Sequence, residues 1–488
     1  MAAIKRILIA NRGEIALRVI RTCKRLGIES VLAASQADLG SLPAKLADRT
    51  LCIGPAPSSE SYLKPQTIVQ AALGSACDAI HPGYGFLSER ASLAKLCEDE
   101  GVIFIGPTSG QIEAVGDKLR ARAEAVAAEV PVAPGGAAAS LEDAVKMGLQ
   151  IGAPLLVKAV GGGGGRGMKR VDRLEDLPEA LSMASAEAGA AFGDERVYLE
   201  RFVSRGRHVE VQVLGDGEGR VIHLGERDCS VQRRYQKLIE ETPGPGLSDE
   251  FRAAIHEAGV RYAARLNYRG AGTVEFLVDV DRGEFYFLEM NARIQVEHPV
   301  TEAVTGVDLV AEQIAIAAGE GLRLQQADIR PQGAAIECRI NAEDPARDFA
   351  PSPGRVTEAV WPGGEGVRVD THIATGAMVP PYYDSLMGKI IAHGRDRAEA
   401  VARLRKAIAE THVEGVATNL GFHAEVLADP EFQAGGMDTG FLGRFFDPSR
   451  RPLARAPQDD DSPGATNLRH GEERRASAAS RTTHSPEA

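Results

Sequence analysis

The sequence has few cysteines and no cysteine motif. Its six cysteines are scattered along 488 residues, and no two of them form a Cys-x-x-Cys pair. This pattern argues against a disulfide framework and against a structural zinc site. Because no signal peptide precedes the first strand-like run, the expected location is the reducing cytoplasm.

Long hydrophobic runs and a surplus of positive charge are also lacking. No apolar run approaches the length of about 20 residues that a membrane span requires. The 68 acidic residues outnumber the 56 Lys and Arg residues, and the net charge of -12 gives no broad attraction for nucleic acid or an anionic membrane. We therefore expect no nucleic-acid or membrane partner. An anionic substrate must be captured by a local basic pocket.

The remaining composition is typical of a globular enzyme with about three domains. Between Ile4 and Pro107, short apolar runs alternate with helical stretches, which predicts an open parallel sheet in an α/β domain. The first run ends at Asn11-Arg12-Gly13 without a G-x-G-x-x-G, so a dinucleotide-binding oxidoreductase is a weak alternative. Residues 448–488 are rich in Pro, Ser, Arg and Asp, which predicts a disordered tail.

Two β-rich runs joined at Asp281-Arg282-Gly283 predict a hairpin that sets Glu275 opposite Glu289. Like charges directly across a ladder are destabilising unless a cation lies between them. Together with the carbonyl of Asn291, these carboxylates are hard oxygen ligands that suit magnesium or manganese. The alternative is a solvated hairpin edge with unpaired charges.

The second strand of this hairpin continues as L-E-M-N-A-R-I-Q-V-E-H-P, from Leu288 to Pro299. Taken as one extended strand, it places alternate residues on a single polar face. Those residues are Glu289, Asn291, Arg293, Gln295 and Glu297. We therefore predict that one face of this strand packs and the other carries chemistry.

Five consecutive glycines follow a predicted strand that ends near Lys158. Glycine loses much entropy on ordering, so such a run indicates backbone that must move or approach a ligand closely. Flanked by Lys158 and Arg166, the segment predicts an anion cradle and a phosphate lid, with a flexible hairpin tip as the alternative. A second basic segment contains Arg227, Arg233, Arg234 and Lys237, which we interpret as a site for phosphate or bicarbonate.

Four motifs, read in order, resemble biotin carboxylase, an ATP-grasp enzyme: K-A-V-G-G-G-G-G-R-G-M, E-R-D-C-S-V-Q-R-R-Y-Q-K, F-L-E-M-N-A-R-I-Q-V-E-H-P and I-E-C-R-I-N-A-E-D-P. The likeness extends from N-R-G-E-I-A to about Phe446. It implies a multidomain α/β and α+β fold. The expected parts are an N-terminal pre-ATP-grasp (Rossmann-like) domain, an ATP-grasp domain with a mobile Gly-rich lid, a C-terminal α+β domain and the tail, over residues 1–115, 116–330 (lid about 131–204), 331–447 and 448–488.

The resemblance also implies a reaction. Members of the family carboxylate biotin, carried on a separate protein or domain, with ATP and bicarbonate and through carboxyphosphate. The implied cofactors are ATP and Mg²⁺ (or Mn²⁺), with biotin as the carrier-bound substrate. The implied partners are a biotin carboxyl carrier protein, a carboxyltransferase subunit and a second copy in a homodimer. The reaction would be the first half-reaction of acetyl-CoA carboxylase in fatty acid biosynthesis, or of another acyl-CoA carboxylase.

Residue roles are carried over to the positions that match the family's motifs. The ATP-binding positions are Lys118, Lys158, Gly164, Gly165, Met168, Glu200, Val203, His208, Gln232, Tyr235, Glu275, Leu277 and Glu289. The bicarbonate positions are Lys237, Arg293, Gln295 and Val296; the metal ligands are Glu275, Glu289 and Asn291; and the biotin positions are Tyr84 and Arg339. The catalytic positions are Glu297 as general base, Arg339, Arg293 and Lys237. Tyr235 departs from the family pattern, in which His or Asn is frequent at the contact with the nucleotide sugar.

Two other functions are weighed against this one. A ligase of another ATP-grasp branch, such as a carbamoyl-phosphate or nucleotide-precursor ligase, would share Glu275 and Glu289 but not the continuation R-I-Q-V-E-H-P. A scaffold without activity would be expected to have lost Lys237, Arg293, Glu297 or Arg339, and all four are present. The final acyl-CoA acceptor depends on the transferase and is not encoded in these motifs.

We predict that this chain carries no biotin of its own. In resembling carriers the modified lysine lies within A-M-K-M, whereas the only Met-Lys pair in this sequence, Met168-Lys169, lies in the predicted lid. Intact-mass measurement of protein purified from a host with a biotin ligase should give the unmodified mass. A covalent biotin adduct would contradict a separate carrier.

Overall fold

The computed structural model describes residues 4–138, 140–159, 168–193 and 195–447. The predictions made for Gly164, Gly165 and the tail at 448–488 lie outside these residues. Five parallel strands form the N-terminal sheet, in the order β3-β2-β1-β4-β5, as the alternating apolar runs predict. This part of the chain contains β1 (Arg6–Ile9), α1 (Gly13–Leu26), β2 (Glu29–Ala34), α2 (Leu42–Leu46), β3 (Arg49–Cys52), α3 (Pro65–Gly74), β4 (Ala79–His81), α4 (Ala91–Glu100), β5 (Ile103–Phe104) and α5 (Ser109–Gly116).

The turn after β1 connects this sheet to the functional region. Asn11 is buried, and its side-chain amide donates hydrogen bonds of 2.7 Å to the carbonyls of both Pro82 and Tyr84. Gly13 then adopts a φ of +68°, a conformation that a residue with a Cβ rarely takes, and α1 begins. The loop after β1 and the loop after β4 are thus fixed against each other at the carboxyl ends of parallel strands, where ligands of open α/β sheets bind.

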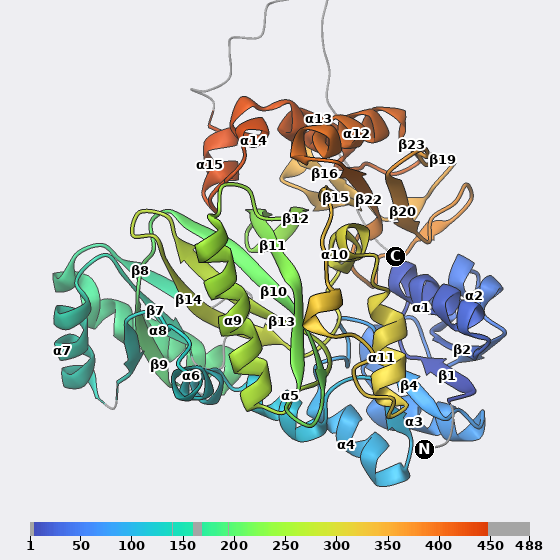
Figure 1. Cartoon of the computed structure of the whole chain (residues 1–488), viewed down its shortest axis with the longest axis horizontal. Coiled ribbons are helices and arrows are strands. Elements are labelled where there is room, and N and C mark those ends of the chain that lie inside the picture. Colours follow the sequence, from blue (N-terminus) through green and yellow to red (C-terminus); the bar gives the residue numbers. More distant parts are fainter. Residues whose placement is uncertain (1–3, 139, 160–167, 194, 448–488) are drawn as a thin grey trace, which may run out of the picture. The chain divides into compact units, whose positions relative to one another are not determined.

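A second sheet has eight antiparallel strands in the order β14-β13-β10-β11-β12-β15-β22-β20. The strands are β10 (Gly206–Asp216), β11 (Val221–Arg233), β12 (Gln236–Thr242), β13 (Arg269–Asp279), β14 (Glu284–Asn291), β15 (Ala334–Asn341), β20 (Val367–Thr371) and β22 (Leu386–Gly394). Helix α9 (Asp249–Arg265) packs on β10, β11 and β13 (Figure 1). The ladder between β12 and β15 joins a strand of the predicted ATP-grasp domain to a strand of the predicted C-terminal domain, so the sheet continues across the predicted boundary at residue 330.

The predicted pairing of Glu275 with Glu289 is confirmed by the register of β13 and β14. Near the turn, Asp279 pairs with Glu284, a register that by itself would place Leu288 opposite Glu275. An irregularity between Glu275 and Phe276 shifts the register by one residue and restores the predicted pair.

The predicted strand from Leu288 to Pro299 is wrong beyond Asn291. There β14 ends, residues 292–297 form a loop, and α10 (His298–Thr305) begins with Pro299 in its first turn. Proline has no amide hydrogen to donate to a ladder, but its fixed φ suits the first turn of a helix. Strand alternation therefore does not explain how Arg293, Gln295 and Glu297 come together.

A smaller four-stranded sheet, in the order β6-β9-β7-β8, lies within the predicted lid. Its elements are β6 (Gly135–Ala137), α7 (Leu141–Ile151), β7 (Leu155–Ala159), β8 (Met168–Val171), α8 (Leu177–Phe192) and β9 (Val197–Arg201). It has its own small core, in which Leu155, Val157 and Leu199 are fully buried. Helix α6 (Lys118–Ala127) precedes it, and its first residue is Lys118, as predicted.

The C-terminal part of the chain combines β15, β20 and β22 with short strands and helices. Its additional elements are β16 (Glu343–Asp344), β17 (Ala350–Pro351), β18 (Gly354–Arg355), β19 (Glu358–Val360), β21 (Met378–Val379), α12 (Arg397–Glu410), β23 (His412–Glu414), α13 (Leu420–Ala428), α14 (Pro430–Ala434) and α15 (Phe441–Phe445). Helix α11 (Leu309–Ala317) follows α10 and precedes β15. In the described part of the chain, no helix combines the length and the apolar character needed to cross a membrane.

Substitution of Phe276 by Ala should strongly destabilise the fold. Phe276 follows Glu275 on β13, is fully buried, and packs edge-on against Phe285 at 5.5 Å. Truncation of a buried Phe to Ala costs about 3–5 kcal/mol. We expect the midpoint of urea unfolding to fall. In the control Leu149→Ala, whose side chain is 64% exposed on α7, the midpoint should hardly change; equal midpoints for both variants would contradict this account of the core.

Candidate active site

A cavity of about 1190 Å³ contains almost every described residue that the sequence predicts for the site. Its walls come from the N-terminal sheet, the small sheet and the eight-stranded sheet. The predicted residues that line it are Tyr84, Lys118, Lys158, Met168, Glu200, Val203, His208, Gln232, Tyr235, Lys237, Glu275, Leu277, Glu289, Asn291, Arg293, Gln295, Val296 and Arg339. Glu297 is buried directly behind this wall, and its ion pairs with Lys237 and Arg339 connect it to the cavity lining.

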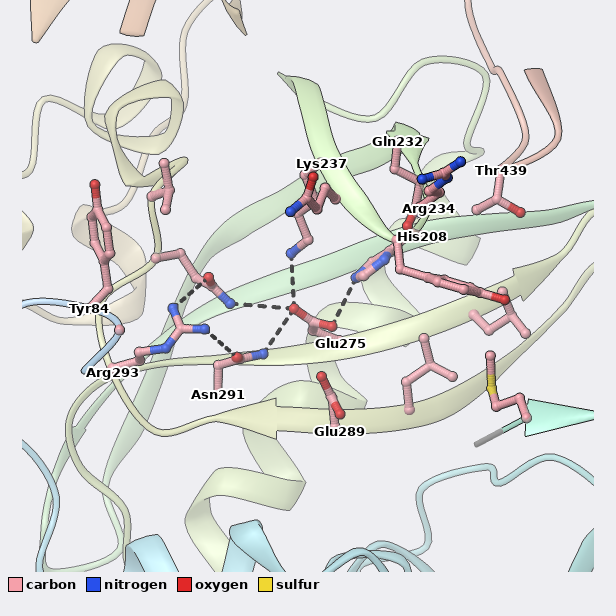
Figure 2. Close-up of a pocket in the computed structure, with 18 of the residues that line it drawn as sticks. Tyr84, His208, Gln232, Arg234, Lys237, Glu275, Glu289, Asn291, Arg293 and Thr439 are labelled. Carbon is pink, nitrogen blue, oxygen red and sulfur yellow. Dashed lines mark hydrogen bonds and ion pairs between the residues drawn. The ribbon is translucent and has the colours of Figure 1, made fainter. Parts of the chain in front are cut away.

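Lys237 connects three carboxylates of the site, and Figure 2 shows its contact with one of them, Glu275. Lys237 lies on β12. Its ammonium donates to three carboxylates: Glu210 at 2.6 Å, Glu275 at 2.9 Å and Glu297 at 2.8 Å. Burial by itself would lower the pKa of Lys237, but the three negative charges outweigh it and raise the pKa well above its ordinary value. Lys237 therefore carries a permanent positive charge in the middle of the cavity wall.

Glu297 is the last residue before α10 and is completely buried. One carboxylate oxygen accepts from Lys237, and the other accepts from Arg339 on β15 at 2.9 Å. Burial would raise the pKa of Glu297, but Lys237, Arg339 and then Arg227 hold it well below the ordinary value. Glu297 is thus ionised at neutral pH and able to accept a proton.

Glu275 and Glu289 form a carboxylate pair that suits a divalent cation. Glu275 accepts from Lys237 and from Asn291 at 2.9 Å, and it lies 3.0 Å from the ring of His208. The Glu289 side chain is exposed within the cavity. Desolvation by the surrounding protein and, after it, the negative charge of Glu275 raise its pKa. A bound cation would relieve the repulsion between the two, so the oxygen donors present fit magnesium or manganese.

Arg293 organises the loop between β14 and α10. Its guanidinium donates to Gln295 Oε1 and to Asn291 Oδ1, both at 2.8 Å (Figure 2). It also donates to Glu89 at 2.8 Å. In this arrangement the amide oxygen of Asn291 faces Arg293, and its nitrogen faces Glu275. The predicted convergence of these side chains is present, but it results from an arginine-centred network rather than from strand alternation.

The opposite end of the cavity has the charges expected around phosphates. Lys158 on β7 forms an ion pair with Glu200 on β9. Burial lowers the pKa of Lys118, although Glu289 opposes this effect. Tyr235 is 61% exposed at the tip of the β11–β12 hairpin, where it adopts a φ of +66°.

The basic segment between Glu226 and Lys237 has three different roles. Arg227 is fully buried and bonded to Glu210, Gln212, Thr273 and Thr301. Both Arg233 and Arg234 pair with the exposed Asp348. Arg227 and Lys237 share Glu210, but of the four cations only Lys237 also contacts Glu275 and Glu297. The prediction of one common anion-binding cluster is therefore wrong.

Several functional neighbours were not predicted as site residues. Glu210 accepts from Lys237, Glu240 accepts from Arg339 at 2.6 Å, and Glu89 accepts from Arg293. Glu240 is buried, and burial raises its pKa to about 7 despite the nearby Arg339. Glu210 shares a strand face with His208. The alternating sequence R-H-V-E-V-Q-V-L, residues 207–214, indicates this shared face. Glu89 and Glu240 carry no comparable pattern.

Three family models match successive parts of the chain. Residues 3–112 match "Biotin carboxylase, N-terminal domain", residues 117–325 match "Carbamoyl-phosphate synthase L chain, ATP binding domain", and residues 337–444 match "Biotin carboxylase C-terminal domain". The central model is named after another ATP-grasp branch, but the two flanking models distinguish between the branches.

Individual relatives agree with these matches. Biotin carboxylase of Nostoc sp. is 50% identical over 439 residues, which is 90% of this chain and 98% of that protein. A biotin carboxylase complex from Campylobacter jejuni is 46% identical, with a TM-score of 0.87 over 90% of this chain and 99% of that one. The biotin carboxylase domain dimer of Hydrogenobacter thermophilus 2-oxoglutarate carboxylase, with MgADP and bicarbonate, is 45% identical, with a TM-score of 0.86 over 91% and 98%.

Replacement of Glu289 by Lys should abolish magnesium-dependent nucleotide binding, because it puts a cation where we predict that a metal ion binds. Calorimetric titration with MgADP should show no detectable binding. The control Glu284→Lys makes the same charge change on the same strand, outside the cavity lining. Unchanged MgADP affinity in Glu289→Lys would refute the cation-binding role of the hairpin.

Proposed function

The chain belongs to the biotin carboxylase family, and from this membership we propose the roles of its active-site residues. The family resemblance, the three-part α/β and α+β architecture and the expected reaction are confirmed by the matched family models and relatives. The chain is an ATP-dependent ligase that carboxylates biotin with bicarbonate, the first half-reaction of acyl-CoA carboxylases. The single observation that best supports the residue roles is the arrangement of Lys237 and Arg339 around Glu297.

Glu297 acts as the general base toward bicarbonate. Its charge at neutral pH makes it an acceptor, but its low pKa also makes it a weak base. When bicarbonate enters beside Lys237 and Arg293, these cations share their hydrogen bonds with the new anion. Of these two cations Lys237 binds Glu297, so its hold on Glu297 weakens. The affinity of Glu297 for a proton then rises as the bicarbonate oxygen becomes nucleophilic.

The nucleotide lies between the small sheet and the hairpin. Lys118 and Lys158 contact the phosphates, and Glu275 and Glu289 hold Mg²⁺, which would neutralise charge on the transferring phosphoryl group. Asn291 is proposed as a further ligand, which requires its amide to turn from Arg293. Met168, Val203 and Leu277 supply apolar contacts, while Glu200, His208, Gln232 and Tyr235 supply polar contacts to the base and sugar.

Arg339 and Tyr84 act at the biotin end of the cavity. Carboxyphosphate breaks down to carbon dioxide and phosphate, and the phosphate takes the N1 proton of biotin. Arg339 then stabilises the negative charge on the ureido oxygen, as a positioned donor does for a developing oxyanion. Carbon dioxide is trapped as carboxybiotin.

The partners follow from this reaction. Biotin arrives on a carrier protein, and a carboxyltransferase subunit removes the carboxyl group. We also propose a homodimer, supported by the dimer of the related Hydrogenobacter thermophilus domain, and a cytoplasmic location, supported by six free cysteines.

Glu297→Gln should abolish bicarbonate-dependent ATP cleavage, since it keeps the size of the side chain and removes the base. A fall of about 100-fold or more is expected for a positioned acid-base group, with MgADP affinity nearly unchanged. The matched control is Glu312→Gln on α11, which alters an acidic side chain paired with Arg323 away from the cavity. Turnover of Glu297→Gln within a few-fold of the wild type would exclude this role.

A further inference from the structure

Lys389 is a fully buried cation beneath the active site. It lies on β22 within the apolar stretch Leu386–Gly394, and its side chain has no exposed surface. The ammonium donates a 2.7 Å hydrogen bond to the backbone carbonyl of Val296 and lies 3.1 Å from Glu14 Oε1. A buried ammonium is costly unless it is paired, so these contacts account for its presence in the core.

The sheet register relates Lys389 to Arg339. These residues are direct partners across the β15–β22 ladder, and their side chains therefore stand on the same face. Arg339 binds the carboxylate of Glu297, and Lys389 binds the carbonyl of the preceding residue, Val296. Two neighbouring cations thus hold consecutive residues of one loop, the first through a side chain and the second through the backbone.

Negative groups around Lys389 keep it charged and in place. Burial by itself would lower its pKa, but Glu14, Glu337 and Asp370 outweigh burial and raise it. Asp370 is its direct partner on β20. Glu14, in the first turn of α1, also accepts a hydrogen bond from the hydroxyl of Tyr84.

We propose that Lys389 is a positioning residue for bicarbonate. Lys389 fixes the position of the loop from Gln295 to Glu297 and connects this loop through Glu14 to Tyr84. The loop has no strand partner of its own, because β14 ends at Asn291, and α10 begins only after it. The bond to Val296 therefore supplies a restraint that secondary structure does not. This inference rests on the proposed function, since it takes Gln295, Val296 and Glu297 as the bicarbonate site.

The test is Lys389→Met, which keeps the length of the side chain and removes the donor. Loss of a hydrogen bond from a charged donor corresponds to about a tenfold to hundredfold change. We expect the KM for bicarbonate in ATP cleavage to rise by this factor, while calorimetric affinity for MgADP changes less than about twofold. Equal losses for bicarbonate and MgADP, or an unchanged bicarbonate KM, would overturn the proposal.

A double variant separates positioning from charge balance. Lys389→Met leaves Glu14 buried without its cation, whereas Lys389→Met with Glu14→Gln removes both charges. The double variant should melt at a higher temperature than the single variant and keep the raised bicarbonate KM. If the bicarbonate KM recovers together with stability, or if neither variant folds, the role of Lys389 is structural and the proposal is wrong.

The control Arg397→Met removes another cation that binds a buried glutamate, Glu241, and a backbone carbonyl, that of Phe432. It lies outside the cavity lining. We expect a lower melting temperature and an unchanged bicarbonate KM. Wild-type protein without bicarbonate-dependent ATP cleavage would refute the proposed function itself, an outcome distinct from a normal KM in Lys389→Met.

Discussion

The active site depends on one buried ammonium that three carboxylates share. Lys237 binds Glu210, Glu275 and Glu297, and each carboxylate belongs to a different element: β10, β13 and the residue before α10. Without this cation, three negative charges would be left close together in a cavity wall, which is strongly destabilising. The same interaction places Glu275, the proposed metal ligand, next to Glu297, the proposed general base. In this proposal metal binding and acid-base chemistry are adjacent because one lysine binds both carboxylates.

The net negative charge of the chain does not exclude anionic substrates, since cations line the active site and three of them are held in place by carboxylates. Arg293 is held by Glu89, Lys158 by Glu200, and Arg339 by Glu240 and Glu297. We expect a substrate anion that enters the cavity to share the hydrogen bonds of these cations instead of meeting a free charge. Such paired cations are fixed in orientation before the substrate arrives, which reduces the reorganisation needed during reaction.

Short-range signals predicted much of this architecture from the sequence. Alternating apolar runs predicted the parallel N-terminal sheet, and the equal distance of Glu275 and Glu289 from a turn predicted their pairing. That pairing depends on a register shift next to Phe276, which no local rule would have supplied. The strand prediction failed after Asn291, because the contacts that fold the loop over residues 292–297 come from Glu89, Arg339 and Lys389, which are distant in sequence. Lys389 gave only a weak signal, a single charge within an apolar strand.

The uninterrupted ladder between β12 and β15 has a consequence for how this chain can be divided. Four consecutive pairs, from Ile239 with Cys338 to Thr242 with Ala335, join the central ATP-binding segment to the C-terminal segment. Separation of the chain into two fragments near residue 330 would leave unpaired backbone amides and carbonyls along the facing edges of β12 and β15. Exposed edges of this kind recruit strands from other molecules. Fragments made at this sequence boundary would therefore associate with one another or aggregate. Segments exchanged between relatives would have to retain both strands of the β12–β15 ladder.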